Sequence, residues 1–230
     1  MTLSFPDGRE LRAGSVFCIG RNYAAHVAEM GDVRAPAPDE TPADPVVFLK
    51  PAGALLPSGG TVVLPRQSES VHHELELVAV IGTAGRHLSE ADALSHVAAY
   101  ALGLDLTARD LQARAKASGT PWSIAKGFDT FAPLGPLVDA RAVGDPQALR
   151  IALQVNGETR QADTTAHMLH PVARLVAFLS TVFTLHPGDL VYTGTPEGVG
   201  PLAAGDRLVA TGTTAAGAPL PELVVTVEAA

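Results

Sequence analysis

The sequence predicts a β-rich α+β fold, with a few helices, in a single domain of 230 residues. Glycine and proline, at 22 and 18 residues, interrupt the chain often. Most apolar runs between them are short and rich in β-branched side chains, which is typical of strands. A hydrophobic content of 47% with 17% charged residues indicates a compact fold with one large core.

These short apolar runs predict a series of strands, bounded by turn residues. The strands are expected at 15–19, 46–50, 61–64, 72–82, 99–106, 150–156, 189–193, 206–211 and near 222–228. Asn156-Gly157 is the signal of a tight β-hairpin.

Helical spacing and end signals predict a smaller number of helices. They are expected at 22–30, 89–97, 108–117 and 171–184. Ser89 is a suitable N-cap for the second, and Pro171 suits the first turn of the last. Residues 31–45 lack any periodicity, and a loop this long is usually a functional lid or disordered.

Bulk properties exclude several classes of function. A net charge of −8 argues against nucleic acid and anionic membranes as partners, because both bind basic surfaces. No apolar run reaches about 18 residues, and the N-terminus lacks a signal-peptide core, so we expect a cytoplasmic protein. Cys18 is the single cysteine, which rules out an internal disulfide; its apolar surroundings indicate an inert buried thiol.

The segment His72-His73-Glu74-Leu75-Glu76-Leu77 has the pattern of a strand. Alternate side chains of a strand share a face, so Glu74 and Glu76 are expected side by side, with the leucines facing the core. Two carboxylates at this separation repel each other unless a cation or a proton lies between them. Asp105, in another apolar run, would need a partner as well.

Together Glu74, Glu76 and Asp105 predict a site for a hard cation. Ligation by oxygen alone suits Mg²⁺ or Mn²⁺ better than zinc, and three protein ligands leave positions for water or a chelating substrate. The alternative is a strand with two exposed glutamates on its solvent face, which is a common pattern.

Three further segments could carry chemistry. His26 and Glu29 are three residues apart on a predicted helix, so their side chains can meet; a carboxylate bound to an imidazole makes it a better general base. Lys126 lies in an apolar setting and could stabilise an oxyanion, although surface lysines also occur in such settings. The loop 193–200, rich in glycine and hydroxyls, could bind a carboxylate or be an ordinary turn.

Taken in order, six motifs resemble the fumarylacetoacetate hydrolase family. They are Ile19-Gly20-Arg21-Asn22-Tyr23, Phe48-Leu49-Lys50-Pro51, His73-Glu74-Leu75-Glu76-Leu77, Asp105-Leu106-Thr107-Ala108-Arg109-Asp110, Ala125-Lys126-Gly127-Phe128-Asp129 and Thr193-Gly194-Thr195-Pro196-Glu197-Gly198-Val199-Gly200. The run Pro121-Trp122-Ser123 looks most like the acylpyruvase and fumarylpyruvate hydrolase branch, which includes oxaloacetate decarboxylases.

The resemblance implies a mixed β-roll core with peripheral helices, a homodimer, and one catalytic domain over 1–230. Residues 15–50 would include a helical lid and loop, and residues 60–206 the metal-site core. Glu74, Glu76 and Asp105 match the family's ligands for Mg²⁺ or Mn²⁺. His26 and Glu29 match a dyad that activates water. Lys126 and Gln112 match groups that polarise a carbonyl. The resemblance also implies contacts to the substrate carboxylate from Arg21, Arg109 and Thr195.

The function expected on this basis is hydrolysis of a C–C bond in a small 2,4-dioxo acid, such as fumarylpyruvate, with release of pyruvate. One alternative is decarboxylation of oxaloacetate at the same metal, which needs no attacking water. Another is isomerisation or decarboxylation of an unsaturated dioic acid in aromatic catabolism. A third is a catalytically silent binding protein on the same scaffold.

Overall fold

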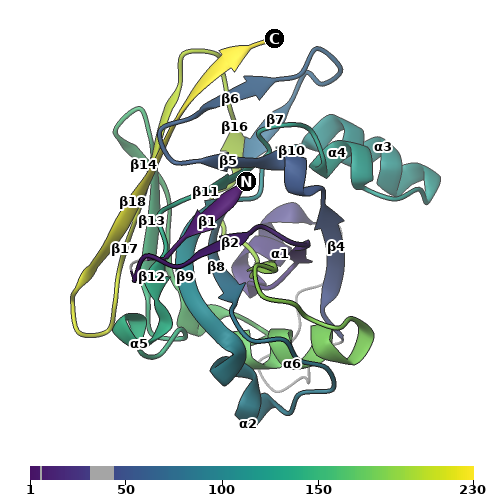
Figure 1. Ribbon diagram of the computed structural model, residues 1–230. Helices are drawn as coiled ribbons and strands as arrows, with labels where there is room; N and C mark the ends of the chain where they lie inside the picture. The colour runs from purple at the N-terminus through teal and green to yellow at the C-terminus, as the bar shows by residue number, and fades with distance from the viewer. Residues whose placement is uncertain (6, 32–43) are drawn as a thin grey trace.

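The computed structural model describes residues 1–5, 7–31 and 44–230. Most of the loop predicted at 31–45 therefore lies outside the described residues. Within them the expected β-rich α+β fold with a curled mixed sheet and few helices is confirmed (Figure 1). No helix of the described part is long and apolar enough to span a membrane.

The largest sheet is mixed and has eight strands. Its order is β4 (Val46–Lys50), β3 (Val16–Gly20), β15 (Leu190–Tyr192), β8 (Leu75–Ile81), β9 (Val97–Leu104), β11 (Ala132–Leu134) and β5 (Leu55–Pro57), with β12 (Val138–Asp139) paired to β9. β15 runs parallel to β3 and antiparallel to β8, so chain segments far apart in sequence meet at the middle of the sheet.

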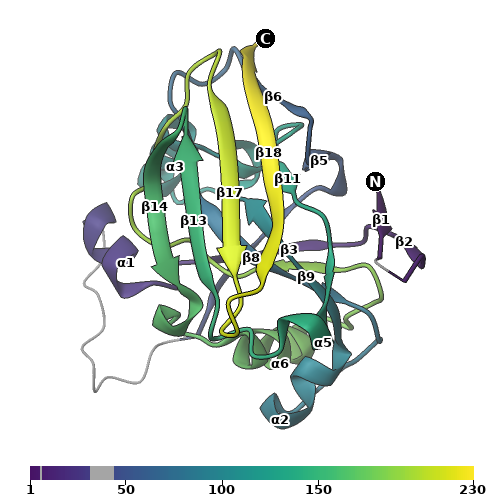
Figure 2. The same cartoon turned by 90° about the vertical axis from the view of Figure 1, so that its left-hand side faces the viewer.

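A second sheet has five strands and lies against the first. Its order is β14 (Glu158–Thr164), β13 (Arg150–Val155), β17 (Arg207–Thr213), β18 (Pro219–Ala229) and β6 (Thr61–Leu64). β13 contacts β8, and β17 and β18 contact β9; Figure 2 shows this sheet facing the viewer with β8 and β9 behind it. The turn between β13 and β14 has positive φ at both Asn156 and Gly157, as the hairpin signal predicts.

The main core lies between the two sheets. Leu77 and Leu102 come from the larger sheet, and Leu153, Leu208 and Leu223 from the smaller one. A second cluster covers the other face of the larger sheet and includes Cys18, which is fully buried. The prediction of a buried thiol is confirmed, and burial raises the pKa of this thiol well above its usual value.

Two small sheets complete the strands. One joins β10 (Thr107–Ala108), β7 (Val71–His73) and β16 (Gly200–Pro201); the other pairs β1 (Thr2–Ser4) with β2 (Glu10–Arg12).

The helices are short and peripheral. They are α1 (Ala24–Met30), α2 (Glu90–Ala93), α3 (Arg109–Ser118), α4 (Ser123–Lys126), α5 (Ala140–Val143) and α6 (Val172–Val182), with 3-10 turns η1 (Ala52–Ala54), η2 (Leu94–His96) and η3 (Thr165–His167). In α6 the apolar positions at helical spacing, Leu175 and Leu179 among them, are fully buried. Ser89 caps α2 by accepting the Asp92 N–H, as expected.

Two predicted elements are divided in the structure. The strand expected over 72–82 breaks at Glu74 into β7 and β8, which belong to different sheets. The break allows the Glu74 carbonyl to accept the Asp105 N–H at 2.8 Å. The helix expected over 89–97 is α2 followed by η2, because the chain must turn there into β9.

Candidate active site

A cluster of carboxylates lies where β8 begins and β9 ends. Glu74 precedes β8, Glu76 lies on it, and Asp105 follows β9; the antiparallel pairing of these strands brings their ends together. One ligand oxygen from each residue lies within 4.8 Å of the others. The exposed fractions are 5%, 1% and 1%, so the alternative of glutamates on a solvent face is wrong.

Buried cations surround this cluster. Lys126 Nζ donates to Glu74 Oε2 at 2.9 Å and to Asp105 Oδ2 at 2.6 Å. Arg109 binds the other oxygen of Glu74. Lys126 is itself 2% exposed, so it is not the surface lysine that the sequence left open.

The surroundings shift the pKa values of Glu74 and Glu76 in opposite directions. Burial alone would raise the pKa of Glu74, but the charges of Lys126 and Arg109 outweigh it and hold that pKa well below the usual range. Burial raises the pKa of Glu76 well above its usual value, and the nearby Asp105 charge adds to the effect. The Gly194 N–H, which donates to Glu76 at 2.8 Å, offsets only part of this.

The cluster fits a divalent cation. Its donors are all carboxylate oxygens, which Mg²⁺ and Mn²⁺ prefer, and they converge from the ends of two paired strands. Glu76 has no ion-pair contact with any described lysine or arginine, so its carboxylate, once ionised, lacks a cationic partner among them. A cation held between the three would supply that charge.

Lys50 is a further buried cation that the sequence reasoning missed. Its Nζ lies 2.9 Å from Asp105 Oδ1 and donates to the carbonyls of Leu106 and Lys126. The sequence signal that could have identified it is a charged residue at the end of the apolar run Val46–Lys50. Lys50 is thereby paired with one oxygen of Asp105 and Lys126 with the other.

The predicted contact between His26 and Glu29 is present on α1. His26 Nδ1 lies 3.2 Å from Glu29 Oε2, and the other oxygen of Glu29 accepts the Gly198 N–H at 3.0 Å. With Nδ1 engaged, Nε2 is the nitrogen left to exchange a proton with a substrate. The Gly198 contact, which the sequence did not reveal, ties the orientation of Glu29 to the loop after β15.

Gln112 and Arg109 are paired on α3, three residues apart. Arg109 donates to Gln112 Oε1 at 2.8 Å, and a guanidinium can only donate. The carboxamide therefore keeps its two N–H hydrogens for other acceptors. Arg109 Nε is buried without a hydrogen-bond partner among the described residues, so one guanidinium N–H is left for a substrate oxygen.

Arg21 and Thr195 come from chain turns at the ends of strands. Arg21 follows β3 with φ of 61°, an uncommon backbone conformation for a side chain of this size. Thr195 follows β15, is 3% exposed, and accepts a hydrogen bond from Gln161. The turn before it requires a glycine, because Gly194 has φ of 98° and a Cβ there would lie 2.6 Å from Asn22 Cβ.

One pocket brings nearly all of these residues together. Its walls include nine of the ten predicted site residues: Arg21, His26, Glu74, Glu76, Asp105, Arg109, Gln112, Lys126 and Thr195. The tenth, Glu29, reaches the pocket through His26. Met30, Phe48 and Trp122 supply apolar wall.

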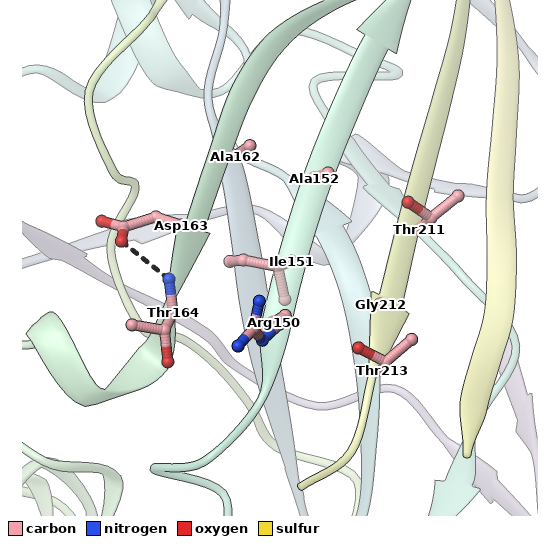
Figure 3. Close-up of a pocket in the computed structure, with 9 residues that line it drawn as sticks. All are labelled: Arg150, Ile151, Ala152, Ala162, Asp163, Thr164, Thr211, Gly212 and Thr213. Atoms are coloured by element: carbon pink, nitrogen blue, oxygen red, sulfur yellow. Dashed lines mark hydrogen bonds between the residues drawn. The ribbon is translucent and has the colours of Figure 1, made fainter. Parts of the chain in front are cut away.

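A larger hollow of about 550 Å³ lies elsewhere, on the five-stranded sheet. Figure 3 shows it lined by β13, β14 and β17, mostly with small side chains such as Ala152, Ala162 and Thr211. Arg150 and Asp163 are its charged residues, and the described residues that line it include no group of three metal-binding side chains. The carboxylate cluster lies in the smaller pocket instead.

A family model of known proteins matches most of the chain. Residues 15–228 match the family model described as fumarylacetoacetate (FAA) hydrolase C-terminal. The chain belongs to the fumarylacetoacetate hydrolase family. The resemblance seen in the six sequence motifs is thus confirmed, and the curled mixed sheet is the one typical of this family.

Two named relatives each match most of the length of this chain. The mitochondrial oxaloacetate tautomerase FAHD1 of Arabidopsis thaliana is 46% identical over 195 residues, which are 85% of this chain and 84% of the relative. Oxaloacetate tautomerase YcgM of Escherichia coli is 45% identical over 197 residues, 85% and 87% of the two chains.

A solved structure is similar over the whole chain. It is the fumarylpyruvate hydrolase of Pseudomonas aeruginosa in complex with Mn²⁺ and pyruvate, which is 42% identical with a TM-score of 0.87 and covers 100% of this chain and 96% of the other. This member of the fumarylacetoacetate hydrolase family is therefore an enzyme with an acidic metal site.

Proposed function

We propose that this enzyme hydrolyses the C3–C4 bond of a 2,4-dioxo acid, such as fumarylpyruvate or another acylpyruvate, and releases pyruvate. The observation that carries the proposal is the His26–Glu29 pair at the same pocket as the carboxylate cluster. Hydrolysis needs both a base for water and a means to stabilise an enolate, and this pocket offers residues for each. The fumarylpyruvate hydrolase structure supports the choice of substrate class.

Glu74, Glu76 and Asp105 would hold Mg²⁺ or Mn²⁺. When bound there, the cation supplies positive charge to the carboxylate and 2-oxo oxygens of the substrate, which stabilises an enolate leaving group. The Mn²⁺ and pyruvate in the related structure support this assignment.

The side chains then divide the remaining steps. His26 Nε2 takes a proton from water, which attacks C4 of the substrate, and Glu29 stabilises the resulting imidazolium. Lys126 and the free N–H groups of Gln112 donate to the oxyanion formed at C4. The C3–C4 bond then breaks. C4 leaves as a carboxylic acid that carries the hydroxyl from water, the electron pair of the bond forms the enolate at C3, and the imidazolium returns a proton to C3 to give pyruvate.

Tautomerisation of oxaloacetate is a second candidate, because curated relatives 45% and 46% identical carry that name. This reaction moves one proton between C3 and the 2-oxo oxygen and needs no attacking water. The same pocket could perform it, with His26 as the base. Decarboxylation of oxaloacetate needs only the enolate stabilisation and no base at His26.

Pyruvate release distinguishes these functions. With Mg²⁺ we expect release from acetylpyruvate and fumarylpyruvate, loss of release in EDTA, and loss in His26→Ala. Release from oxaloacetate that persists in His26→Ala would indicate decarboxylation in addition. Intact acylpyruvates, combined with accelerated loss of the ultraviolet absorbance of enol-oxaloacetate, would replace the hydrolase proposal by the tautomerase.

A further inference from the structure

Gln161 is a buried polar residue of β14 that connects two parts of the active site. It belongs to the five-stranded sheet and is 1% exposed. Its Oε1 accepts from the Leu75 N–H at 2.9 Å and from His73 Nδ1 at 3.1 Å. Its Nε2 donates to Thr195 Oγ1 and to the Pro196 carbonyl, both at 2.9 Å.

Backbone partners fix the orientation of this carboxamide. The Leu75 N–H can only donate, so the atom facing it must be the oxygen of Gln161. The Pro196 carbonyl can only accept, so the atom facing it must be the nitrogen. The reversed carboxamide would place two donors together on one side and two acceptors on the other.

This orientation decides what the Thr195 hydroxyl can do. Because its oxygen accepts from Gln161 Nε2, its own hydrogen is free to be donated elsewhere. No acceptor for that hydrogen is found among the described residues, although Thr195 is 3% exposed. Thr195 lines the pocket that contains the carboxylate cluster.

We propose that Gln161 is a positioning residue that holds the Thr195 hydroxyl as a hydrogen-bond donor for the carboxylate of a bound 2-oxo acid. This inference rests on the proposed function for the class of substrate. The same carboxamide also holds Leu75, which lies between the two glutamates of the metal site. Gln161 therefore fixes the position of the Thr195 hydroxyl relative to the metal ligands Glu74 and Glu76.

Replacing Gln161 by glutamate would reverse the direction of its hydrogen bond with Thr195. In Gln161→Glu an ionised side chain offers only acceptors, so the Thr195 hydroxyl turns its hydrogen toward residue 161 and away from the substrate. In Thr195→Val the donor is absent altogether. Gln161→Met, which removes the same donor without adding charge, serves if the glutamate variant does not fold.

The test measures oxalate binding to Mn²⁺-loaded protein by calorimetry. Oxalate is a planar dianion that presents the same pair of chelating oxygens as a 2-oxo acid. A hydrogen bond to a charged group contributes about 1.5–3 kcal/mol, so Thr195→Val and Gln161→Glu are each expected to weaken oxalate about 10- to 100-fold. Affinity for Mn²⁺ alone should change less than about threefold.

The double variant distinguishes a positioning role of Gln161 from a general loss of structure. If Gln161 acts through Thr195, adding Gln161→Glu to Thr195→Val weakens oxalate little further. Gln147→Glu is the matched control, since Gln147 also bridges a backbone N–H, of Val172, and a backbone carbonyl, of Thr165, but away from the pocket. It should lower thermal stability and leave oxalate affinity unchanged.

Three results would overturn the proposal. One is an additive loss in the double variant, and another is an equal loss of Mn²⁺ and oxalate affinity in Gln161→Glu. The third is a wild-type protein that binds Mn²⁺ but no oxalate, because the anion site itself would then be missing. A wild type that binds oxalate but cleaves no dioxo acid would contradict only the proposed reaction.

Discussion

Lys126 and Asp105 form a buried ion pair, with Nζ 2.6 Å from Oδ2, and the same ammonium also reaches Glu74 at 2.9 Å. Lys126 is therefore engaged by two proposed metal ligands. Its pKa is raised: burial alone would lower it, but the two carboxylates outweigh that effect. In the proposed reaction, Lys126 would donate to the substrate oxyanion, with a bound cation supplying positive charge to these carboxylates.

Replacing Lys126 by methionine should separate its two roles. Loss of an oxyanion donor typically costs ~10²–10³ in kcat, so steady-state turnover of an acylpyruvate should fall by about that factor. In EDTA the melting temperature should also fall, because Asp105 and Glu74 lose a buried partner, and Mg²⁺ should restore much of it. A variant with unchanged turnover would show that Lys126 only neutralises the carboxylates.

Lys50 offers a contrasting test, since it binds Asp105 without lining the pocket. Lys50→Met removes one of two cations that hold Asp105, and breaking a buried pair typically costs about 3–5 kcal/mol. We expect a lower free energy of unfolding and weaker Mg²⁺ affinity. At saturating Mg²⁺ kcat should change much less than in Lys126→Met. An equal loss of kcat in the two variants would contradict this division of roles.

Stability of the metal-free enzyme should depend on pH through Glu76. Its pKa in the folded state lies well above the ordinary 4.5, so the folded state binds more protons than the unfolded state above pH 4.5. Stability must then fall as the pH rises from 4.5 through the folded-state pKa. Glu74 acts in a separate, more acidic pH range. Its pKa is lowered in the folded state, so its contribution to stability is complete above pH 4.5 and is lost as the pH falls below 4.5 through the folded-state pKa.

Denaturant melts in EDTA across this pH range check the Glu76 effect. The difference in stability between wild type and Glu76→Gln should shrink at acidic pH and widen in favour of the variant as the pH rises. Saturating Mg²⁺ should reverse the order at neutral pH. A pH-independent difference would mean that Glu76 is ionised in the metal-free fold.

Gly198 and Gly205 form a matched pair for testing the loop that holds Glu29. Both have positive φ, of 89° and 94°. A Cβ at Gly198 would lie 2.2 Å from the Arg160 carbonyl oxygen, whereas at Gly205 nothing lies within 4 Å. Gly205→Ala should cost about 1–2 kcal/mol of stability for its backbone conformation and leave activity intact.

Gly198→Ala should cost more stability than Gly205→Ala and should also lower kcat, because the loop must shift away from the Arg160 carbonyl and the Gly198 N–H contact with Glu29 is then disturbed. The pH profile of kcat should shift as well, since Glu29 then supports the imidazolium of His26 less well. Loss of stability without any change in that profile would indicate that the Gly198 contact is merely structural.

Much of the fold and site could be predicted because the signals are local. Alternation along Glu74 and Glu76, the three-residue spacing of His26 and Glu29, and Pro171 before a periodic helix each depend on neighbours in sequence. The spacing of Arg109 and Gln112 carried the same kind of information, although their mutual contact was not predicted.

The roles of Gln161 and Lys50 could not be predicted, because their partners are distant in sequence. Gln161 is 86 residues from Leu75 and 34 from Thr195, and no periodicity marks it. The break at Glu74 was equally hidden: the pattern of 72–82 reads as one strand, and only pairing with separate sheets divides it.

The most direct test of the metal site is a titration of EDTA-treated protein with Mn²⁺, followed by calorimetry and by the electron paramagnetic resonance of free Mn²⁺. Glu76→Gln is the informative variant because it removes one ligand without leaving a described lysine or arginine unpaired. Glu69→Gln, an exposed acidic residue, is the control. We expect one Mn²⁺ per chain in wild type and control, and affinity at least about tenfold weaker in Glu76→Gln. Equal affinity in all three proteins would contradict a cation bound by Glu74, Glu76 and Asp105.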